Sequence, residues 1–465
     1  GFSSNSKRVE SQPVEKVTRM YLSILWHLHQ PIYRSPITNK YVLPWVNFHM
    51  TKNYYQMAVL AEETDFPCTF NLVPCLLEQM KEYSEGRAGD VLQETLDKSP
   101  EKLTLAQVMR LAEFLPKGTR ENDMSEIQLQ ALQSFFSPLA KAKGDKKALL
   151  ELQKKVQKRV LPYYQKLNRA GKIELTTSAY YHPLLPLVFD VRAGGGEKMP
   201  ALPFAHPEDG GLQIDKGRRY FKRIFGENPR GFWPSEGGLS QEVAGTISKK
   251  GYDFAVTDEN ILWKSLNKAP DPNLLNRPYL CQGLTIFFRD RELSDLLSFE
   301  SWKWDEKEAV AHFLSQLEKR RKSCSDDQAI CVLALDGENP WAGYKSNGVP
   351  FLREFYSQLK KKEGITPGFF KDYLTLRKPE TEVKLVPGTW MGNFSKWIGS
   401  AAKNAGWDRL ARARDLCGPK EEILIAEGSD WFWWFGEENK AEFEGLFSEY
   451  LKKAYESEGK KFVDE

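Results

Sequence analysis

Cysteine is scarce in this 465-residue chain, and no two cysteines form a C-x-x-C pair. The six are Cys68, Cys75, Cys281, Cys324, Cys331 and Cys417. Because zinc ribbons and dithiol redox modules need closely spaced pairs, this spacing argues against both kinds of module. It does not indicate a disulfide framework either.

The chain also lacks a dominant charge and a long apolar run. Its 66 basic and 63 acidic residues leave a formal net charge of +3, so no field that would attract nucleic acid is implied. No apolar run is long enough to span a membrane, and no secretory h-region is recognisable. We therefore expect no nucleic-acid partner, no membrane association and a cytoplasmic location. Residues 1–19 are polar and predict a flexible N-terminal tail.

Length and aromatic content indicate what the chain can build. A chain of 465 residues is long enough for a barrel with an appended region, and 41% apolar residues support a real core. Its 13 tryptophans exceed what a core needs and fit the stacking of sugar rings. Plain packing of the indole rings is the alternative.

Seven short apolar segments predict strands that are buried on both faces. They are residues 20–26, 68–73, 173–178, 230–233, 253–257, 284–288 and 329–335. Helical stretches separate most of them, which predicts parallel pairing through crossovers in an α/β barrel over residues 20–364. A helical insertion is expected at about 99–172. Beyond residue 364 the alternation stops, and predicted helices at 390–417 and 437–456 indicate a helical domain over 365–465.

Polar side chains follow six of the seven predicted strands directly. They include His27, His29, Asp258, Arg289, Asp290, Asp336 and Glu338. In α/β barrels the chemistry gathers at the carboxyl ends of the strands. A polar cluster after strand upon strand therefore predicts one functional site at that edge.

The segment GFWPSEGG at residues 231–238 presents the most distinctive carboxylate. Its proline ends a strand and its glycines allow a sharp turn, which predicts an exposed Glu236 beside the face of Trp233. Such a carboxylate suits chemistry on a sugar ring that is stacked on the indole. The alternative is that Glu236 caps a helix that begins near Ser240.

His27 and His29 are two residues apart, so on an extended backbone they share one face. Two such histidines suit metal ligation or contacts with sugar hydroxyls, and two structural histidines are the alternative. With a strand-end Asp they would form the zinc site of a sugar deacetylase or mannosidase-type enzyme. That hypothesis leaves Glu236 without an evident task. A carbohydrate-binding scaffold without catalysis is disfavoured because both candidate carboxylates are present.

Two further segments remain open. The loop at 190–211 is rich in Gly and Pro and is expected to be a lid or binding loop. The aromatic run at 428–436 is either core between packed helices or, because of Asp430, part of a polar cleft.

Several motifs together resemble those of glycoside hydrolase family 57. They occur in the family's order and span most of residues 20–456. The matching segments are His27-Leu28-His29-Gln30-Pro31, Gly171-Lys172-Ile173-Glu174 with His182-Pro183, Trp233-Pro234-Ser235-Glu236, Asp336-Gly337-Glu338 and Ser429-Asp430-Trp431. One departure is that Ser235 intervenes where many members place proline next to the glutamate. The versions around Glu236 and Asp430 look more like those of amylase and amylopullulanase members than of branching enzymes.

The resemblance implies a fold, an activity and a site. The fold is an incomplete seven-stranded parallel (β/α)7 barrel followed by a C-terminal helical domain. The activity is retaining hydrolysis of α-glucans, α-1,4 and possibly α-1,6 linked, without a metal or cofactor. Glu236 would be the nucleophile and Asp336 the general acid/base. The residues expected to bind substrate or tune the pair are His27, His29, Trp233, Asp258, Arg289, Asp290, Glu338, Trp341, Asp430 and Trp431.

A retaining pair sets further expectations. The two carboxyl groups would lie ~5–5.5 Å apart. Asp336 would hold a proton near neutral pH, helped by desolvation from Leu335 and Trp341, while Glu236 stays ionised. Glu338 is the rival acid. A 4-α-glucanotransferase or a branching enzyme would use the same pair with a sugar acceptor, and the sequence does not separate these activities from hydrolysis.

Overall fold

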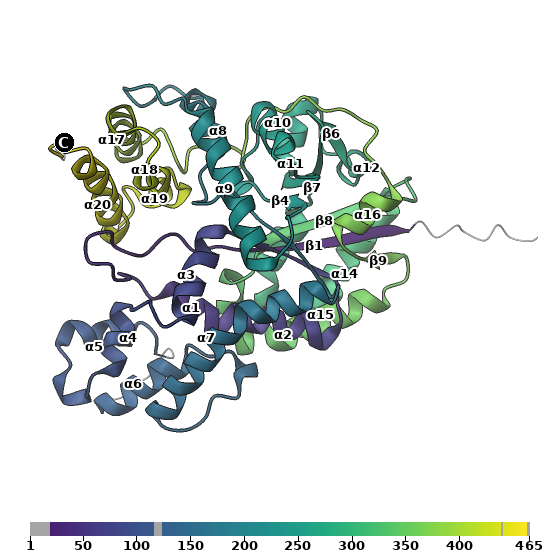
Figure 1. Cartoon of the computed structure of the whole chain (residues 1–465). Coiled ribbons are helices and arrows are strands. Elements are labelled where there is room, and N and C mark those ends of the chain that lie inside the picture. Colours follow the sequence, from purple (N-terminus) through teal and green to yellow (C-terminus); the bar gives the residue numbers. More distant parts are fainter. Residues whose placement is uncertain (1–18, 116–122, 439, 463–465) are drawn as a thin grey trace, which may run out of the picture.

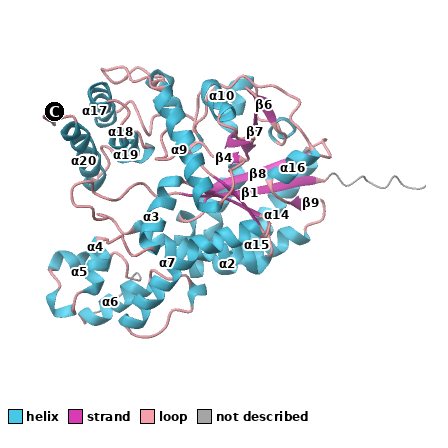
Figure 2. Ribbon diagram, viewed as in Figure 1, coloured by secondary structure: helices cyan, strands magenta, loops and turns pink. Residues whose placement is uncertain are grey.

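The computed structural model describes residues 19–115, 123–438 and 440–462. The tail predicted over residues 1–19 lies outside the described residues except for Arg19. A strand-rich centre is surrounded by helices, with further helices at two ends of the molecule (Figures 1 and 2).

The prediction of seven short parallel strands in an α/β barrel is confirmed. The strands are β1 (Met20–Leu28), β2 (Cys68–Leu72), β3 (Ile173–Thr176), β4 (Gly231–Phe232), β5 (Phe254–Asp258), β7 (Leu284–Arg289) and β8 (Ala329–Asp336). They run in the order β8-β1-β2-β3 and β4-β5-β7, and a parallel bridge between Thr177 and Phe232 joins the two halves. The Asp290 amide, directly after β7, donates to the Val332 carbonyl of β8 (2.8 Å). This contact brings β7 next to β8. The sheet therefore curls into an incomplete barrel.

Two short strands were missed by the sequence analysis. β6 (Tyr279–Cys281) pairs antiparallel with β7, and β9 (Ile365–Pro367) pairs parallel with β1. Each has only three residues, too few for a recognisable apolar pattern. β9 lies just beyond the expected boundary at 364, so the chain still belongs to the sheet there. The division into domains stays a prediction.

Helices cover the outside of the curl and form the insertion between β2 and β3. In chain order they are α1 (Trp45–His49), α2 (Tyr55–Thr64), α3 (Pro74–Ser84), α4 (Val91–Asp97), α5 (Leu105–Ala112), α6 (Met124–Gln133), α7 (Lys146–Arg169), α8 (Leu185–Phe189), α9 (Pro207–Phe225), α10 (Gln241–Lys249), α11 (Glu259–Leu266), α12 (Pro272–Leu275), α13 (Arg291–Asp295), α14 (Glu306–Ser323), α15 (Val349–Lys361) and α16 (Phe370–Leu376). In Figure 1, α4, α5 and α6 form a lobe beside the barrel. That lobe has its own small core, which includes Leu96, Phe135 and Leu149.

Four helices form the C-terminal end: α17 (Ala401–Cys417), α18 (Glu421–Ala426), α19 (Ser429–Trp434) and α20 (Ala441–Ser457). The helix predicted over 390–417 is wrong in its first third, because residues 390–400 form turns. Gly392 and Gly399 both have positive φ there, which interrupts a helix. The loop at 190–206 contacts α17, where the Leu202 amide donates to Asp408 (2.7 Å). Among the described residues, no helix combines the length and apolar character needed to cross a membrane.

The interior of the curl is closed by α16, which is held by one buried carboxylate. Phe370 packs with Phe254 and Phe287 inside the barrel. Glu174 of β3 accepts hydrogen bonds from the Phe370 amide (3.0 Å) and the Lys371 amide (3.1 Å) at the start of α16. A carboxylate at a helix start satisfies amides that have no partner within the helix. Glu174 therefore points inward and fixes α16 to the sheet.

We predict that Glu174→Ala lowers the free energy of unfolding by about 3 kcal/mol, because it leaves buried amides without an acceptor. Urea unfolding followed by circular dichroism measures the loss. Glu308→Ala, on the exposed face of α14, is the matched control and should change stability by less than about 0.5 kcal/mol. Equal midpoints for the two variants would contradict the role of Glu174.

Candidate active site

The ends of β1, β2 and β8 bring three polar residues side by side. His27 is in register with Asn71 of β2 and with Asp336 of β8. The His27 Nδ1–H donates to the Asn71 amide oxygen (2.7 Å), so Nε2 carries the lone pair. Burial lowers the pKa of His27 to about 3, with the neighbouring His29 adding to the effect. His27 is therefore a neutral side chain in a fixed orientation.

Glu236 is buried, not exposed as the sequence predicted, with 8% of its surface accessible. Two donors hold its carboxylate: Ser429 Oγ to Oε1 (2.9 Å) and Trp390 Nε1 to Oε2 (3.0 Å). Burial, with the charges of Asp430 and Asp336, raises the pKa of Glu236 to about 8, although the two hydrogen bonds act to lower it. We expected Glu236 to be ionised near neutral pH, but a pKa of about 8 favours its protonated form there.

The helix-cap alternative for Glu236 is wrong. Ser240 caps α10, because its Oγ accepts from the Val243 amide (3.3 Å). Glu236 instead sits in a tight turn with a φ of 57°, a left-handed conformation that is unfavourable for a residue with a side chain. The turn aims the carboxylate at Ser429 and Trp390.

Asp336, at the end of β8, is the second carboxylate of the site. Burial raises its pKa, as the sequence analysis expected, while a hydrogen bond from Asn339 Nδ2 (3.0 Å) and the positive charge of Arg289 lower it. Asp336 also raises the pKa of Glu236, so the two groups sense each other's charge. Their predicted separation stays a prediction.

Glu338, the rival acid, has a different surrounding from Asp336. It is 3% exposed, and its Oε1 accepts from the His29 amide (3.2 Å), the Gln30 amide group (3.3 Å) and the Tyr54 hydroxyl (3.2 Å). These contacts tie the chain after β1 to the chain after β8. Glu338 therefore links the segments that carry His29 and Asp336, and its contact with substrate stays a prediction.

A third histidine of the site, His182, was not among the predicted site residues. Its ring stacks on His29 with centroids 3.7 Å apart, and its Nδ1 lies 3.0 Å from Ser429 Oγ. Burial holds the pKa of His182 far below its usual range, so the ring is neutral. Since Ser429 donates its one proton to Glu236, His182 Nδ1–H must donate to Ser429. A hydrogen-bonded chain thus runs from His182 through Ser429 to Glu236.

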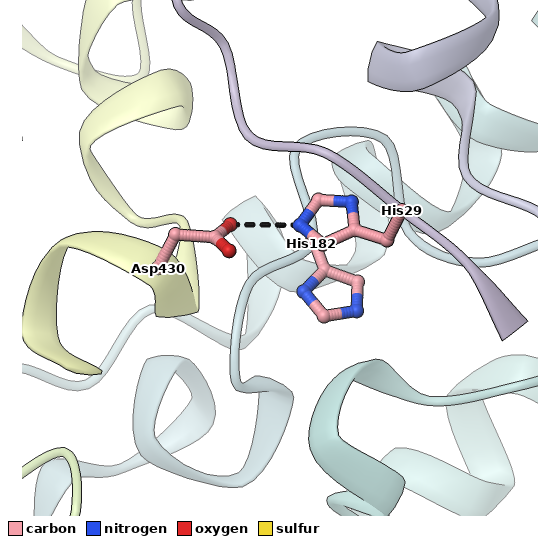
Figure 3. A group of neighbouring side chains, drawn as sticks. All are labelled: His29, His182 and Asp430. Atoms are coloured by element: carbon pink, nitrogen blue, oxygen red, sulfur yellow. Dashed lines mark hydrogen bonds and ion pairs between the residues drawn. The ribbon is translucent and has the colours of Figure 1, made fainter. Parts of the chain in front are cut away.

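His29, His182 and Asp430 are the described residues that come nearest to a metal site. Their ligand atoms lie within 4.8 Å of one another, and Figure 3 shows the His29 Nε2–Asp430 contact of 2.8 Å beside the stacked rings. An imidazole binds a metal in its ring plane, and these two planes are nearly parallel, 20° apart. Their lone pairs therefore do not converge on one ion. The arrangement fits a hydrogen-bonded His29–Asp430 pair better than the zinc site considered for His27 and His29.

The polar ends of β5 and β7 form buried ion pairs, and the positive charge of Arg289 lowers the pKa of Asp336. Arg289 pairs with Asp258 (2.7 Å), and its guanidinium lies over the Trp390 ring (5.5 Å). Asp290 pairs with Arg320 (2.6 Å) and caps α13. Arg289 thus packs on the Trp390 ring, which donates to Glu236. Asp258 and Asp290 hold this region through their own ion pairs, with Arg289 and Arg320.

The three tryptophans among the expected substrate-binding residues are all buried. Trp341 and Trp431 are buried, and their indole N–H groups donate to the Gly337 and Ile425 carbonyls, both at 2.7 Å. Trp431 packs against α20, so the core alternative for this part of the run is right. Trp233 is buried too, 5.5 Å from the ring of Trp390. Sugar stacking on these three rings does not fit their burial.

The structure therefore brings together Glu236, Asp336, His27, His29 and Asp430, all predicted. His29, Asp336 and Asp430 stay partly accessible, as does Trp390.

Sequence reasoning missed Asn71, His182, Trp390 and Ser429 as site residues. His182 and Ser429 stood inside matched motifs, which was a usable signal. Asn71 is a polar residue inside an apolar strand. Trp390 lay in a segment that was expected to be a helix, and it carried no signal.

Known proteins share this architecture. A branching enzyme from Thermococcus kodakaraensis superposes with a TM-score of 0.65 at 18% identity, covering 94% of this chain and 90% of that one. An α-amylase from Thermotoga maritima gives a TM-score of 0.64 at 16% identity, covering 96% and 95%. At these identities the likeness concerns the fold alone.

Sequence comparison reaches the same group. An α-amylase from Pyrococcus abyssi is 24% identical over 243 residues, and a 4-α-glucanotransferase from Thermococcus kodakarensis is 23% identical over 248. These matches span about half of this chain and only a third of the relatives' length. A sequence model described as glycosyl hydrolase family 57 matches residues 23–385. Since that match covers most of the chain and agrees with the fold, the chain belongs to glycosyl hydrolase family 57.

Proposed function

We propose that this chain cleaves α-glucans by a retaining mechanism, with Glu236 as nucleophile and Asp336 as general acid/base. The observation that carries the proposal is the difference between the surroundings of the two carboxyls. Glu236 receives two hydrogen bonds that favour its ionised form, from Ser429 and Trp390. Asp336 receives one, from Asn339, and remains partly accessible. A fixed nucleophile and an accessible proton donor suit this reaction.

The reaction would proceed in two balanced steps. In the first, a Glu236 oxygen attacks the anomeric carbon while the bond to the glycosidic oxygen breaks, and Asp336 gives its proton to that departing oxygen. In the second, the Asp336 carboxylate takes a proton from water, whose oxygen attacks the anomeric carbon and releases Glu236. Two inversions leave the configuration retained.

Transfer to a sugar hydroxyl in place of water is the second candidate. Relatives named α-amylase and 4-α-glucanotransferase both match this chain, which supports either outcome. The two differ only in the acceptor that meets the glycosyl-enzyme. Resolving the products formed from maltooligosaccharides distinguishes them, because transfer yields chains longer than the substrate.

Substituting the two carboxyls separates their roles. Glu236→Gln should abolish turnover of every substrate, because no leaving group replaces a nucleophile. Asp336→Asn should slow glucan cleavage by about 10²–10⁴-fold, yet it should still react with α-glucosyl fluoride, whose fluoride leaves without a proton. Added azide should then release an α-glucosyl azide, identified by NMR.

The matched control for that experiment is Glu338→Gln, which changes the neighbouring buried acid. We expect it to keep the ratio of fluoride to glucan activity of the unaltered protein. A β-glucosyl azide would refute the retaining assignment. Fluoride-selective activity in Glu338→Gln instead of Asp336→Asn would transfer the acid/base role to Glu338.

The pH dependence follows from the buried nucleophile. Glu236 must be ionised to attack, and burial raises its pKa to about 8. The acid limb of kcat/KM should therefore rise with pH through about 8. Trp390→Phe removes a donor to the ionised form. A bond worth about 1.5 kcal/mol then corresponds to roughly one pKa unit, so the limb should move upward by about one pH unit.

The control for the pH profile is Trp433→Phe, which removes an indole N–H from a ring that packs on Trp397. Its acid limb should coincide with that of the unaltered protein. If Trp390→Phe lowers kcat/KM equally at every pH, the Trp390 hydrogen bond does not tune Glu236.

Metal dependence is a separate test, motivated by the nearly parallel planes of His29 and His182. Prolonged chelation with EDTA should leave glucan cleavage within about twofold of its initial rate, since a carboxylate pair needs no Lewis acid. Loss of activity that zinc restores would favour the metal-dependent alternative.

A further inference from the structure

Three large aromatic side chains are exposed on one short segment between β7 and β8. Phe299 is 63% accessible, Trp302 43% and Trp304 41%. We call these three residues the aromatic rim. Exposed tryptophan surface is unusual on a protein, and several such rings in a six-residue stretch point to a ligand.

The rim is built on an irregular but anchored helix. After α13 the chain forms a π-helix at Leu296–Glu300 and then a 3₁₀ turn at Ser301–Lys303. π-helical turns are rare and frequently mark functional sites. On the inner side Leu297 is fully buried, and its carbonyl accepts from the Tyr344 hydroxyl (2.6 Å). Because this backbone is anchored, the three aromatic side chains are held on the outside of the protein.

A cavity of about 520 Å³ adjoins the rim. Its lining combines apolar and polar side chains, including Leu296, Phe299, Glu292, Glu300, His312 and Gln316. The Trp304 ring contacts the His312 ring edge-on, with centroids 4.8 Å apart, so the rim and the cavity are continuous. Aromatic faces beside carboxylates and an amide suit a neutral ligand rich in hydroxyl groups. The carboxylates disfavour phosphates and nucleic acids.

The rim also adjoins the candidate active site. Trp302 packs over Gly343, where an added Cβ would lie 3.1 Å from the indole. Gly343 belongs to the chain that follows Asp336. Asp295, which lines the cavity, pairs with Arg289 (3.2 Å), whose guanidinium lies over Trp390. A series of contacts from Asp295 through Arg289 and Trp390 thus links the cavity to Glu236.

We propose that the aromatic rim is a second binding surface for the substrate chain, on which sugar rings of a long α-glucan stack outside the catalytic pair. This inference rests on the proposed function, because it takes the same polysaccharide as ligand. The rim would add affinity for long chains and leave the cleavage of short ones unchanged. It touches neither Glu236 nor Asp336 and takes no part in the chemistry.

The test compares Trp302→Ala, Trp304→Ala and the double variant on amylose and on maltotriose. Stacking on one aromatic ring gives roughly a fivefold change in affinity. We expect KM for amylose to rise about fivefold in each single variant and more than tenfold in the double variant, with kcat unchanged. Kinetics on maltotriose should stay within twofold.

Two control variants test whether the effect comes from the aromatic faces of the rim. Leu376→Ala removes a side chain that is 64% exposed on α16 and should change neither substrate. Trp304→Phe keeps an aromatic face and should recover part of the affinity for amylose. If Trp302→Ala fails to fold, because its ring packs on Gly343, Trp304→Ala with Trp304→Phe still decides the question.

Binding without turnover separates this inference from the proposed function. Retardation of Glu236→Gln in amylose-containing gels should weaken, with an apparent dissociation constant raised more than tenfold, when Trp302→Ala and Trp304→Ala are added. Unchanged retardation and unchanged KM on amylose, in a protein that cleaves glucans, would overturn the rim alone. A protein that neither binds nor cleaves any glucan would overturn both. If the double variant only converts a dimer to a monomer in sedimentation velocity, the rim is a subunit interface.

Discussion

The two hydrogen bonds to the Glu236 carboxylate are the contacts on which the site depends. Both donors come from the chain beyond the barrel strands, Trp390 from the turns before α17 and Ser429 from the start of α19. Both bonds lower the pKa of Glu236, while burial and the charges of Asp430 and Asp336 raise it. The C-terminal region therefore does more than pack against the barrel, because it supplies the two groups that lower the pKa of this carboxyl against the effect of burial.

A buried network holds these donors in place. Arg289 lies over the ring of Trp390, and Asp258 and Asp295 in turn neutralise Arg289. On the other side, the Ser429 amide donates to the His182 carbonyl (2.9 Å), so backbone and side-chain contacts join the same two segments. Removing one member of such a network leaves a buried charge or donor unpaired, which costs more than the lost contact itself.

The barrel could be predicted from the sequence because each of its seven parallel strands is recognisable from its own short apolar segment. A run such as 329–335 is short, apolar and followed by a polar cluster, and the helices between such runs allow only parallel pairing. The same local signal did not reveal that Asp258, Arg289 and Asp290 form buried ion pairs. A polar residue after a strand marks the right edge of the sheet, but it does not reveal whether its side chain faces an opening or a buried partner.

The remaining errors have two causes. Trp390 and Ser429 are 154 and 193 residues from Glu236 in sequence, and no spacing rule links groups so far apart. Glu338 follows Asp336 by two residues, yet the backbone turns between them, and Glu338 faces the chain after β1. Contacts between distant segments and the direction of a turn need the folded structure.

Glu236 and His182 are both non-glycine residues in the left-handed region, with φ of 57° and 56°. Such a conformation costs roughly 1–2 kcal/mol per residue, so the fold is kept strained at the two ends of the hydrogen-bonded chain. Selection for thermal stability alone would favour glycine or asparagine at both positions. The carboxylate of Glu236 and the imidazole of His182 are therefore held in place at a cost in stability. A designer who transplants the site into another barrel must therefore import the strained turns with the side chains.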